Sequence, residues 1–119
     1  MPAIVAFMDD LMFLSRIRVA AGAQGLTVVS ARAVSDLVEA SRQGARLVLV
    51  DLDARLPAID AIAAVTTDPA LSGVRVVGFF SHVHAERGRQ ARAAGCVEAL
   101  PRSAFAERLQ GLLRDLRPA

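Results

Sequence analysis

The sequence contains no lysine, no tryptophan and no tyrosine, and it has a single cysteine among its 119 residues. One thiol cannot form an internal disulfide or a cysteine-rich zinc site, so we expect a reducing compartment, with the cytoplasm as the default. The absence of lysine excludes Schiff-base chemistry. Five phenylalanines are the only residues of the Phe, Tyr and Trp type. Because single-stranded nucleic acid is bound by stacking its bases on aromatic side chains, the sequence gives no support for that function.

Long hydrophobic runs are also missing from the sequence. No segment approaches the roughly 20 uninterrupted apolar residues that a membrane helix needs, and Asp9 and Asp10 interrupt the N-terminal apolar run. We therefore expect neither export nor insertion into a membrane. The net charge of +2 is too small to predict a nucleic-acid partner. With 54% hydrophobic residues, the chain is expected to form one domain over residues 1–119.

Short apolar runs alternate with segments of helical periodicity along the whole chain. The predicted strands span residues 3–8, 26–30, 47–50, 74–80 and 96–100. The predicted helices span residues 11–23, 34–42, 57–66 and 85–94, and Ser103 is predicted to cap a fifth helix. This alternation predicts an α/β fold of the flavodoxin-like type, a three-layer sandwich. Its five-stranded parallel sheet would have the order 2-1-3-4-5, with helices on both faces.

Carboxylates follow two strands that should be neighbours in this sheet. The first predicted strand ends at Asp9 and Asp10, and the third ends at Asp51. The strand order reverses between these two strands, and ligands of such sheets bind at that point, beyond the carboxyl ends. Converging carboxylates repel one another unless a hard cation, an arginine or a raised pKa intervenes, and Mg²⁺ is the natural candidate. In the alternative interpretation, Asp9 or Asp10 simply caps the helix that follows.

These residues resemble the receiver domain of bacterial response regulators, and the resemblance covers nearly the whole chain. It is carried by Met8-Asp9-Asp10-Leu11 and by Leu-Val-Leu-Val-Asp-Leu-Asp at residues 47–53. The resemblance implies that Asp9 and Asp10, together with Asp51, hold Mg²⁺. It also implies that Asp51 is the phosphoacceptor, which receives a phosphoryl group from a sensor histidine kinase.

The same resemblance implies a signalling role rather than an enzymatic one. We expect a stand-alone module that acts by protein–protein contact, with a histidine kinase or another signalling protein as its partner. Receiver-like domains often dimerise through the fourth helix, the fifth strand and the fifth helix, so the resemblance suggests a homodimer through that face.

The switch positions of the family are altered in this sequence. The family has Thr or Ser at the end of strand four, where its hydroxyl follows the phosphoryl oxygens. Counting back from Ala94-Gly95 places Phe80 at that position, and Ser81 lies one residue away. Ser81 takes the position only if the loop is one residue shorter, which would also shift the strand alternation. Ala99 replaces the family's switch aromatic, and the ring of Phe80 could fill the space it leaves.

Two further departures concern the surroundings of Asp51. The family ends strand five with Lys-Pro, whereas this chain has Leu-Pro-Arg, so Arg102 is the substitute counter-charge. Arginine preserves the charge of lysine but not its compact geometry. After Asp51, Leu56-Pro57 and Asp60-Ala61 replace the family's Met-Pro and Asp-Gly, with a longer loop. These changes favour a degenerate receiver that docks constitutively over a phosphorylatable one, and both cases stay open.

A small phosphatase is the alternative function from another class. Asp51 and Asp53 match the Asp-x-Asp opening of haloacid-dehalogenase-like phosphatases, in which the first carboxylate is the nucleophile and the second a general acid. Such enzymes need a lysine and more chain after the motif, and this sequence has neither.

Other chemically distinctive residues are expected to have structural roles. His82 and His84 have no third histidine or cysteine partner, so we expect loop residues rather than metal ligands. Cys96 should be a small buried apolar residue. The fourth predicted helix carries an arginine cluster, which is either a solvated face or a docking face for an acidic partner: Arg87, Arg89 and Arg92.

Overall fold

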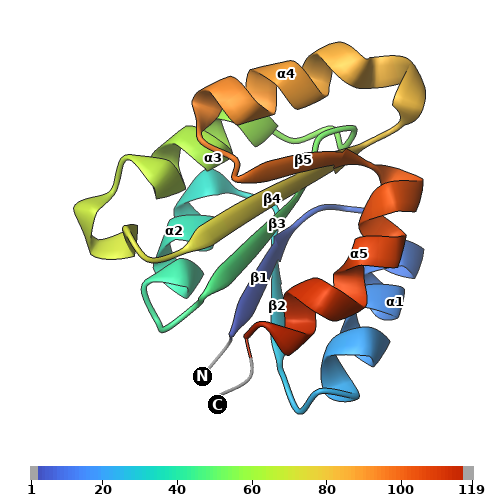
Figure 1. The fold of residues 1–119 in the computed structure, drawn as a ribbon. Coiled ribbons are helices and arrows are strands. Elements are labelled where there is room, and N and C mark those ends of the chain that lie inside the picture. Colours follow the sequence, from blue (N-terminus) through green and yellow to red (C-terminus); the bar gives the residue numbers. More distant parts are fainter. Residues whose placement is uncertain (1–2, 117–119) are drawn as a thin grey trace.

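The computed structural model describes residues 3–116, which form a sheet of five parallel strands with helices on both faces (Figure 1). The strands are β1 (Ile4–Phe7), β2 (Val28–Ala31), β3 (Leu47–Asp51), β4 (Arg75–Phe80) and β5 (Glu98–Pro101). The helices are α1 (Leu11–Gly22), α2 (Val34–Ser41), α3 (Ala58–Thr66), α4 (Ala85–Ala94) and α5 (Arg102–Arg114). Short 3₁₀ turns lie at η1 (Pro69–Leu71) and η2 (His82–His84).

The sheet has the predicted strand order, β2-β1-β3-β4-β5, and every neighbouring pair is parallel. The α/β sandwich expected from the sequence is therefore confirmed for the described residues. The predicted domain also includes residues 1–2 and 117–119, which lie outside them. Among the described residues, no helix is both long and apolar enough to cross a bilayer.

Two strands, β2 and β5, begin two residues later than predicted, because the first residues assigned to them close the preceding helix. The Leu26 amide donates to the Ala21 carbonyl at 2.9 Å, and the Cys96 amide donates to the Ala91 carbonyl at 3.0 Å. In each case the preceding residue is a glycine with positive φ, which turns the chain so that the bond can form: Gly25 at 71° and Gly95 at 123°. The predicted cap at Ser103 is also wrong. Helix α5 starts at Arg102, one residue before Ser103, so Ser103 lies inside the helix. The N-cap position is Pro101, which ends β5 and makes no side-chain hydrogen bond to the helix.

The core lies in two layers, one on each face of the sheet. Helices α1 and α5 cover one face, and α2, α3 and α4 cover the other (Figure 1). Along β3, Leu47 and Leu49 belong to the α1 and α5 layer, whereas Val48 and Val50 belong to the opposite layer. This alternation of side chains places Asp51, two residues after Leu49, on the α1 and α5 side at the carboxyl edge of the sheet.

Three phenylalanine rings pack directly under this edge. Phe13 of α1, Phe79 of β4 and Phe105 of α5 form a cluster whose ring centroids lie 4.5 to 6.0 Å apart. Phe79 and Phe105 are fully buried. Because the rings join two helices to a central strand, they hold the start of α1 and the start of α5 in a defined position above the sheet.

The end of α4 provides a test of the described packing. We expect Gly95→Ala to destabilise the fold by about 1 kcal/mol or more, because an added Cβ would lie 2.6 Å from Thr66 Cγ2 and φ is +123°. Gly73→Ala is the matched control, since its Cβ would meet nothing within 4 Å. Urea denaturation measures both, and equal midpoints for the two variants would contradict the geometry at Gly95.

Candidate functional site

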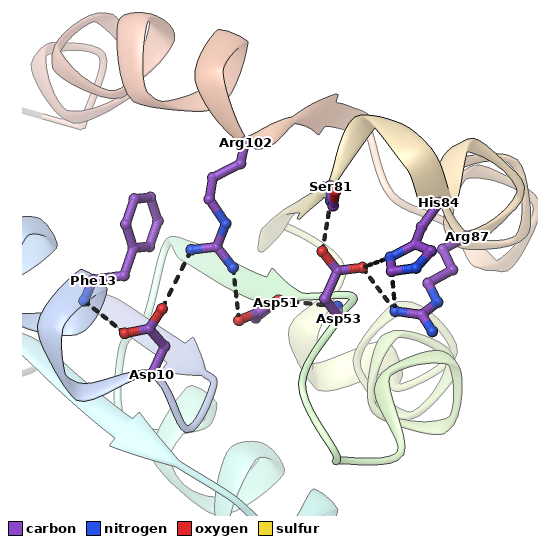
Figure 2. A network of polar contacts seen from close by, with 8 residues as sticks. All are labelled: Asp10, Phe13, Asp51, Asp53, Ser81, His84, Arg87 and Arg102. Carbon is purple, nitrogen blue, oxygen red and sulfur yellow. Dashed lines mark hydrogen bonds and ion pairs between the residues drawn. The ribbon is translucent and has the colours of Figure 1, made fainter.

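The side chain of Arg102, the first residue of α5, lies between the carboxylates of two neighbouring strand ends (Figure 2). Its Nη2 is 3.2 Å from Oδ2 of Asp51, and its Nη1 is 3.6 Å from Oδ2 of Asp10. The guanidinium also lies over the ring of Phe13, with Cζ 4.5 Å from the ring centroid. An arginine of the chain itself therefore neutralises the carboxylates at the point where the strand order reverses.

Asp10 and Asp9 have different environments. Asp10 is the N-cap of α1, and its Oδ1 accepts a hydrogen bond from the Phe13 amide at 3.0 Å. The helix-capping interpretation is thus confirmed for Asp10. Asp9 is exposed. The structure brings Asp10 and Asp51 together on one arginine, and Asp9 takes no part in that contact.

The expected magnesium site does not fit this arrangement. Within residues 3–116, no three His, Cys, Asp or Glu side chains are placed to hold a metal ion. The Arg102 guanidinium contacts both Asp10 and Asp51, and a divalent cation bound by the two carboxylates would be repelled by it. Of the three ways to relieve the repulsion between carboxylates, the chain uses a neighbouring arginine.

Asp51 is almost completely enclosed. Its side chain is 3% exposed, Oδ1 accepts a hydrogen bond from the Asp53 amide at 2.9 Å, and Oδ2 faces Arg102. Burial raises the pKa of Asp51, although the Asp53 amide and the charge of Arg102 act in the opposite direction. The ionised carboxylate is therefore held in the fold at a net cost, which is more typical of functional sites than of stabilising ion pairs.

A second carboxylate, Asp53, connects the loop after β3 to the segment after β4 (Figure 2). It accepts hydrogen bonds from the Ser81 amide and from Arg87 Nη1, the latter at 2.8 Å, and lies 3.0 Å from His84 Nδ1. Burial alone would raise the pKa of Asp53, but these contacts together hold it below its ordinary value. We call Asp53, Ser81, His84 and Arg87 the Asp53 clasp.

The Asp53 clasp bears on two of the alternatives that the sequence leaves open. A general acid must be protonated, whereas the lowered pKa keeps Asp53 ionised, so the geometry gives no support to the phosphatase. The three arginines of the predicted cluster on α4 also form contacts within the chain, while Arg89 and Arg92 stay exposed, so the solvated face and the docking face both remain open. Arg87 pairs with Asp53, Arg89 pairs with Glu86, and Arg92 donates to the Ala99 carbonyl at 3.1 Å.

The side chains of Phe80 and Ser81 lie in different parts of the structure. Phe80 is buried in the layer that α2, α3 and α4 cover, where Ala99 also lies, and its ring packs so close to Gly88 that a Cβ there would come within 2.6 Å. Ser81 instead lines the same hollow as Arg102. Of these two residues, Ser81 is therefore the one that lines the hollow beside Arg102, and the Phe80 ring lies on the other face of the sheet.

Other chemically distinctive residues have ordinary positions. Cys96 is buried, and burial raises the pKa of its thiol to about 12, so it is inert as expected. His82 is exposed. His84 contacts Asp53, a role that the sequence did not predict, because the two residues are 31 positions apart and lie on different loops.

No protein-family model and no curated protein matches the sequence, whereas many solved structures match the fold. The receiver domain of the DNA-binding response regulator merR from Colwellia psychrerythraea has a TM-score of 0.81 at 13% identity, over 98% of each chain. The phosphorylated cyanobacterial response regulator RcpA has a TM-score of 0.73 at 18% identity, over 95% of this chain and 89% of its own.

A third similar structure contains a metal ion. The receiver domain of the sensor histidine kinase PA1611 from Pseudomonas aeruginosa, with magnesium coordinated in its active-site cleft, has a TM-score of 0.76 at 16% identity. The aligned region covers 95% of this chain and 94% of that one. Together these structures show that the chain has the fold of response regulator receiver domains, as its strand order and acidic strand ends predict.

The clasp predicts how stability depends on Asp53. We expect Asp53→Asn to lower the free energy of unfolding by roughly 1–3 kcal/mol at neutral pH, because hydrogen bonds to an ionised acceptor are lost. Since the pKa of Asp53 is lowered in the fold, this contribution is present above the ordinary aspartate pKa and disappears as the pH falls through the folded value.

Denaturation of Asp53→Asn and of the wild type across an acidic pH series measures this difference. Glu107→Gln, on an exposed position of α5, is the control and should leave stability unchanged. A difference between wild type and Asp53→Asn that stays constant down to the lowest pH would contradict the assigned contacts.

Asp51 should behave in the opposite way. Because the pKa of Asp51 is raised in the fold, its ionised form opposes folding at neutral pH, and this cost diminishes as the pH falls from the raised value to the ordinary aspartate pKa, below which it is gone. We therefore expect Asp51→Asn to raise the melting temperature at neutral pH, with the gain shrinking under acid. A lower melting temperature for Asp51→Asn would mean that the Arg102 contact outweighs the burial of Asp51.

Proposed function

We propose that this chain is a receiver-fold signalling module that acts by protein–protein contact and does not depend on phosphorylation of Asp51. The observation that carries this proposal is the position of Arg102, which bridges Asp10 and Asp51 where the resemblance to receiver domains would place Mg²⁺. In the proposal the module is a docking component and not an enzyme.

The immediate surroundings of Asp51 support this proposal. A phosphoryl group is transferred to a carboxylate oxygen, and in Asp51 both oxygens already have partners: Oδ1 accepts from the Asp53 amide and Oδ2 from Arg102. The side chain is 3% exposed, so an incoming phosphohistidine would have to displace Arg102. A Mg²⁺ ion held by Asp9, Asp10 and Asp51 would have to displace it too.

The Asp53 clasp supports a constitutive form of docking. In the resembling family, the hydroxyl after β4 and a ring on β5 respond to the phosphoryl group. Here the segment after β4 is tied to Asp53 through the Ser81 amide and Arg87, and β5 carries Ala99. Contacts within the chain thus hold the switch region in one conformation without an added group.

The partner class follows from the same resemblance. We propose a sensor histidine kinase or another signalling protein in the cytoplasm, and neither nucleic acid nor a membrane. Homodimerisation would use α4, β5 and α5, and two exposed apolar side chains close to these elements favour it: Val83, 69% exposed, and Val97, 56% exposed.

The test is exposure of the wild type to acetyl phosphate with Mg²⁺, followed by intact-mass measurement. We expect no increase in mass, because Arg102 and the Asp53 amide occupy both oxygens of Asp51. RcpA, whose phosphorylated form is known, is the positive control. A mass increase in the wild type that is absent from Asp51→Ala would overturn the proposal.

The variant Arg102→Ala tests whether Arg102 is the obstacle. Its removal leaves Asp10 and Asp51 without their shared cation, so Mg²⁺ should shift the NMR signals of both residues in this variant and not in the wild type. Shifts of the same size in the wild type would show that Mg²⁺ displaces Arg102, and would contradict the role assigned to it.

A further inference from the structure

A hollow of about 480 Å³ opens beside Arg102, between α1, the segment after β4 and the start of α5. Its charged side chains are Arg16 and Arg102, and its hydroxyl groups are those of Ser81 and Ser103. His82, also exposed, lies at its border. No carboxylate is among the lining residues, although Asp51 is bound to the other side of the same guanidinium. The hollow therefore presents two arginine side chains and two hydroxyl groups as hydrogen-bond donors.

These donors retain capacity to bind a ligand. Arg16 is exposed and forms no ion pair with any described residue. Arg102 contacts Asp10 and Asp51 through its terminal nitrogens, yet its side chain is 33% exposed and a guanidinium has five N–H groups. Helix α5 begins at this hollow without a side-chain cap, so amides of its first turn add further donors to the arginines.

Apolar residues also line the hollow. Phe13 and Pro101 line it from α1 and the end of β5, and Ala106 lines it from the second turn of α5. The volume is within the usual range of about 300–1,000 Å³ for small-molecule sites. A ligand that matches both kinds of lining residue carries an anionic group and an apolar body.

We propose that this hollow binds a small organic phosphate without forming a covalent bond to the chain. A phosphate monoester has several acceptor oxygens, which match guanidinium and hydroxyl donors arriving from α1, the segment after β4 and α5. The site is separate from Asp51, which is buried and does not line the hollow. The proposal goes beyond docking, since it assigns the module a ligand.

A neighbouring hollow of about 380 Å³ is less suited to an anion. It shares Phe13, Arg16 and Arg102 with the first one, but Asp10 also lines it. A carboxylate in the wall would repel a phosphate, so the charge distribution favours the hollow that contains Ser81 and Ser103.

Titration of the ¹⁵N-labelled protein with phenyl phosphate tests this site. We expect saturable shifts of the amide signals of Arg16, Ser81 and Ser103, and at least roughly tenfold weaker binding in Arg16→Gln, because a charge-assisted contact is lost. Arg18→Gln, an exposed arginine on α1 that does not line the hollow, is the matched control and should bind like the wild type. Inorganic phosphate should bind more weakly than phenyl phosphate, because it makes no contact with the apolar lining residues.

Three outcomes of the titration would overturn this proposal. They are unchanged binding in Arg16→Gln, equal weakening in Arg18→Gln, which would indicate attraction by net charge alone, and equal affinity for inorganic phosphate. An intact mass that rises after incubation with phenyl phosphate would also contradict a non-covalent site. The acetyl phosphate experiment measures modification of Asp51 instead, so failure of one proposal is distinguishable from failure of the other.

Discussion

The bridge from Arg102 to Asp10 and Asp51 is the interaction on which the arrangement of this edge of the sheet depends. Parallel strands that end in carboxylates at one edge create a local excess of negative charge, which needs a cation close by. Pro101 ends β5 and leads directly into α5, so the first side chain of that helix reaches over the two carboxylates. The phenylalanine cluster beneath holds α1 and α5 at the spacing that this contact requires.

Asp51 and Asp53 show how strongly position decides the behaviour of a carboxylate. They are two residues apart, yet burial raises the pKa of Asp51, whereas hydrogen bonds outweigh burial and lower the pKa of Asp53. Asp53 receives donors from the segment after β4, and it therefore ties two loops together. Asp51 has only one arginine and one amide to offset its enclosure. Asp53 therefore strengthens the scaffold, and Asp51 is maintained at a cost to it.

The receiver fold brings a site to this edge but does not prescribe its chemistry. In this chain, the cation between the carboxylates is part of the polypeptide, and the segment after β4 is held by the Asp53 clasp. In the function proposed above, both internal contacts take the place of an added group. The same arginine faces a hollow on its other side, so one residue connects the buried acidic edge with a surface that can receive an anion.

The sequence by itself determined the strand order and the two acidic strand ends, because these follow from alternation along the chain and from the residues at strand ends, whereas Arg102 was expected near Asp51 only through the resemblance to receiver domains. It did not determine that Asp9 is exposed while Asp10 caps α1, or that Phe80 and Ser81 lie on opposite sides of the sheet. It also did not determine that Asp53 contacts His84 and Arg87. It also placed the starts of β2 and β5 too early. Periodicity is a local property, whereas the contacts of Asp53 join residues about 30 positions apart, and only the packing of helices against the sheet brings those side chains together.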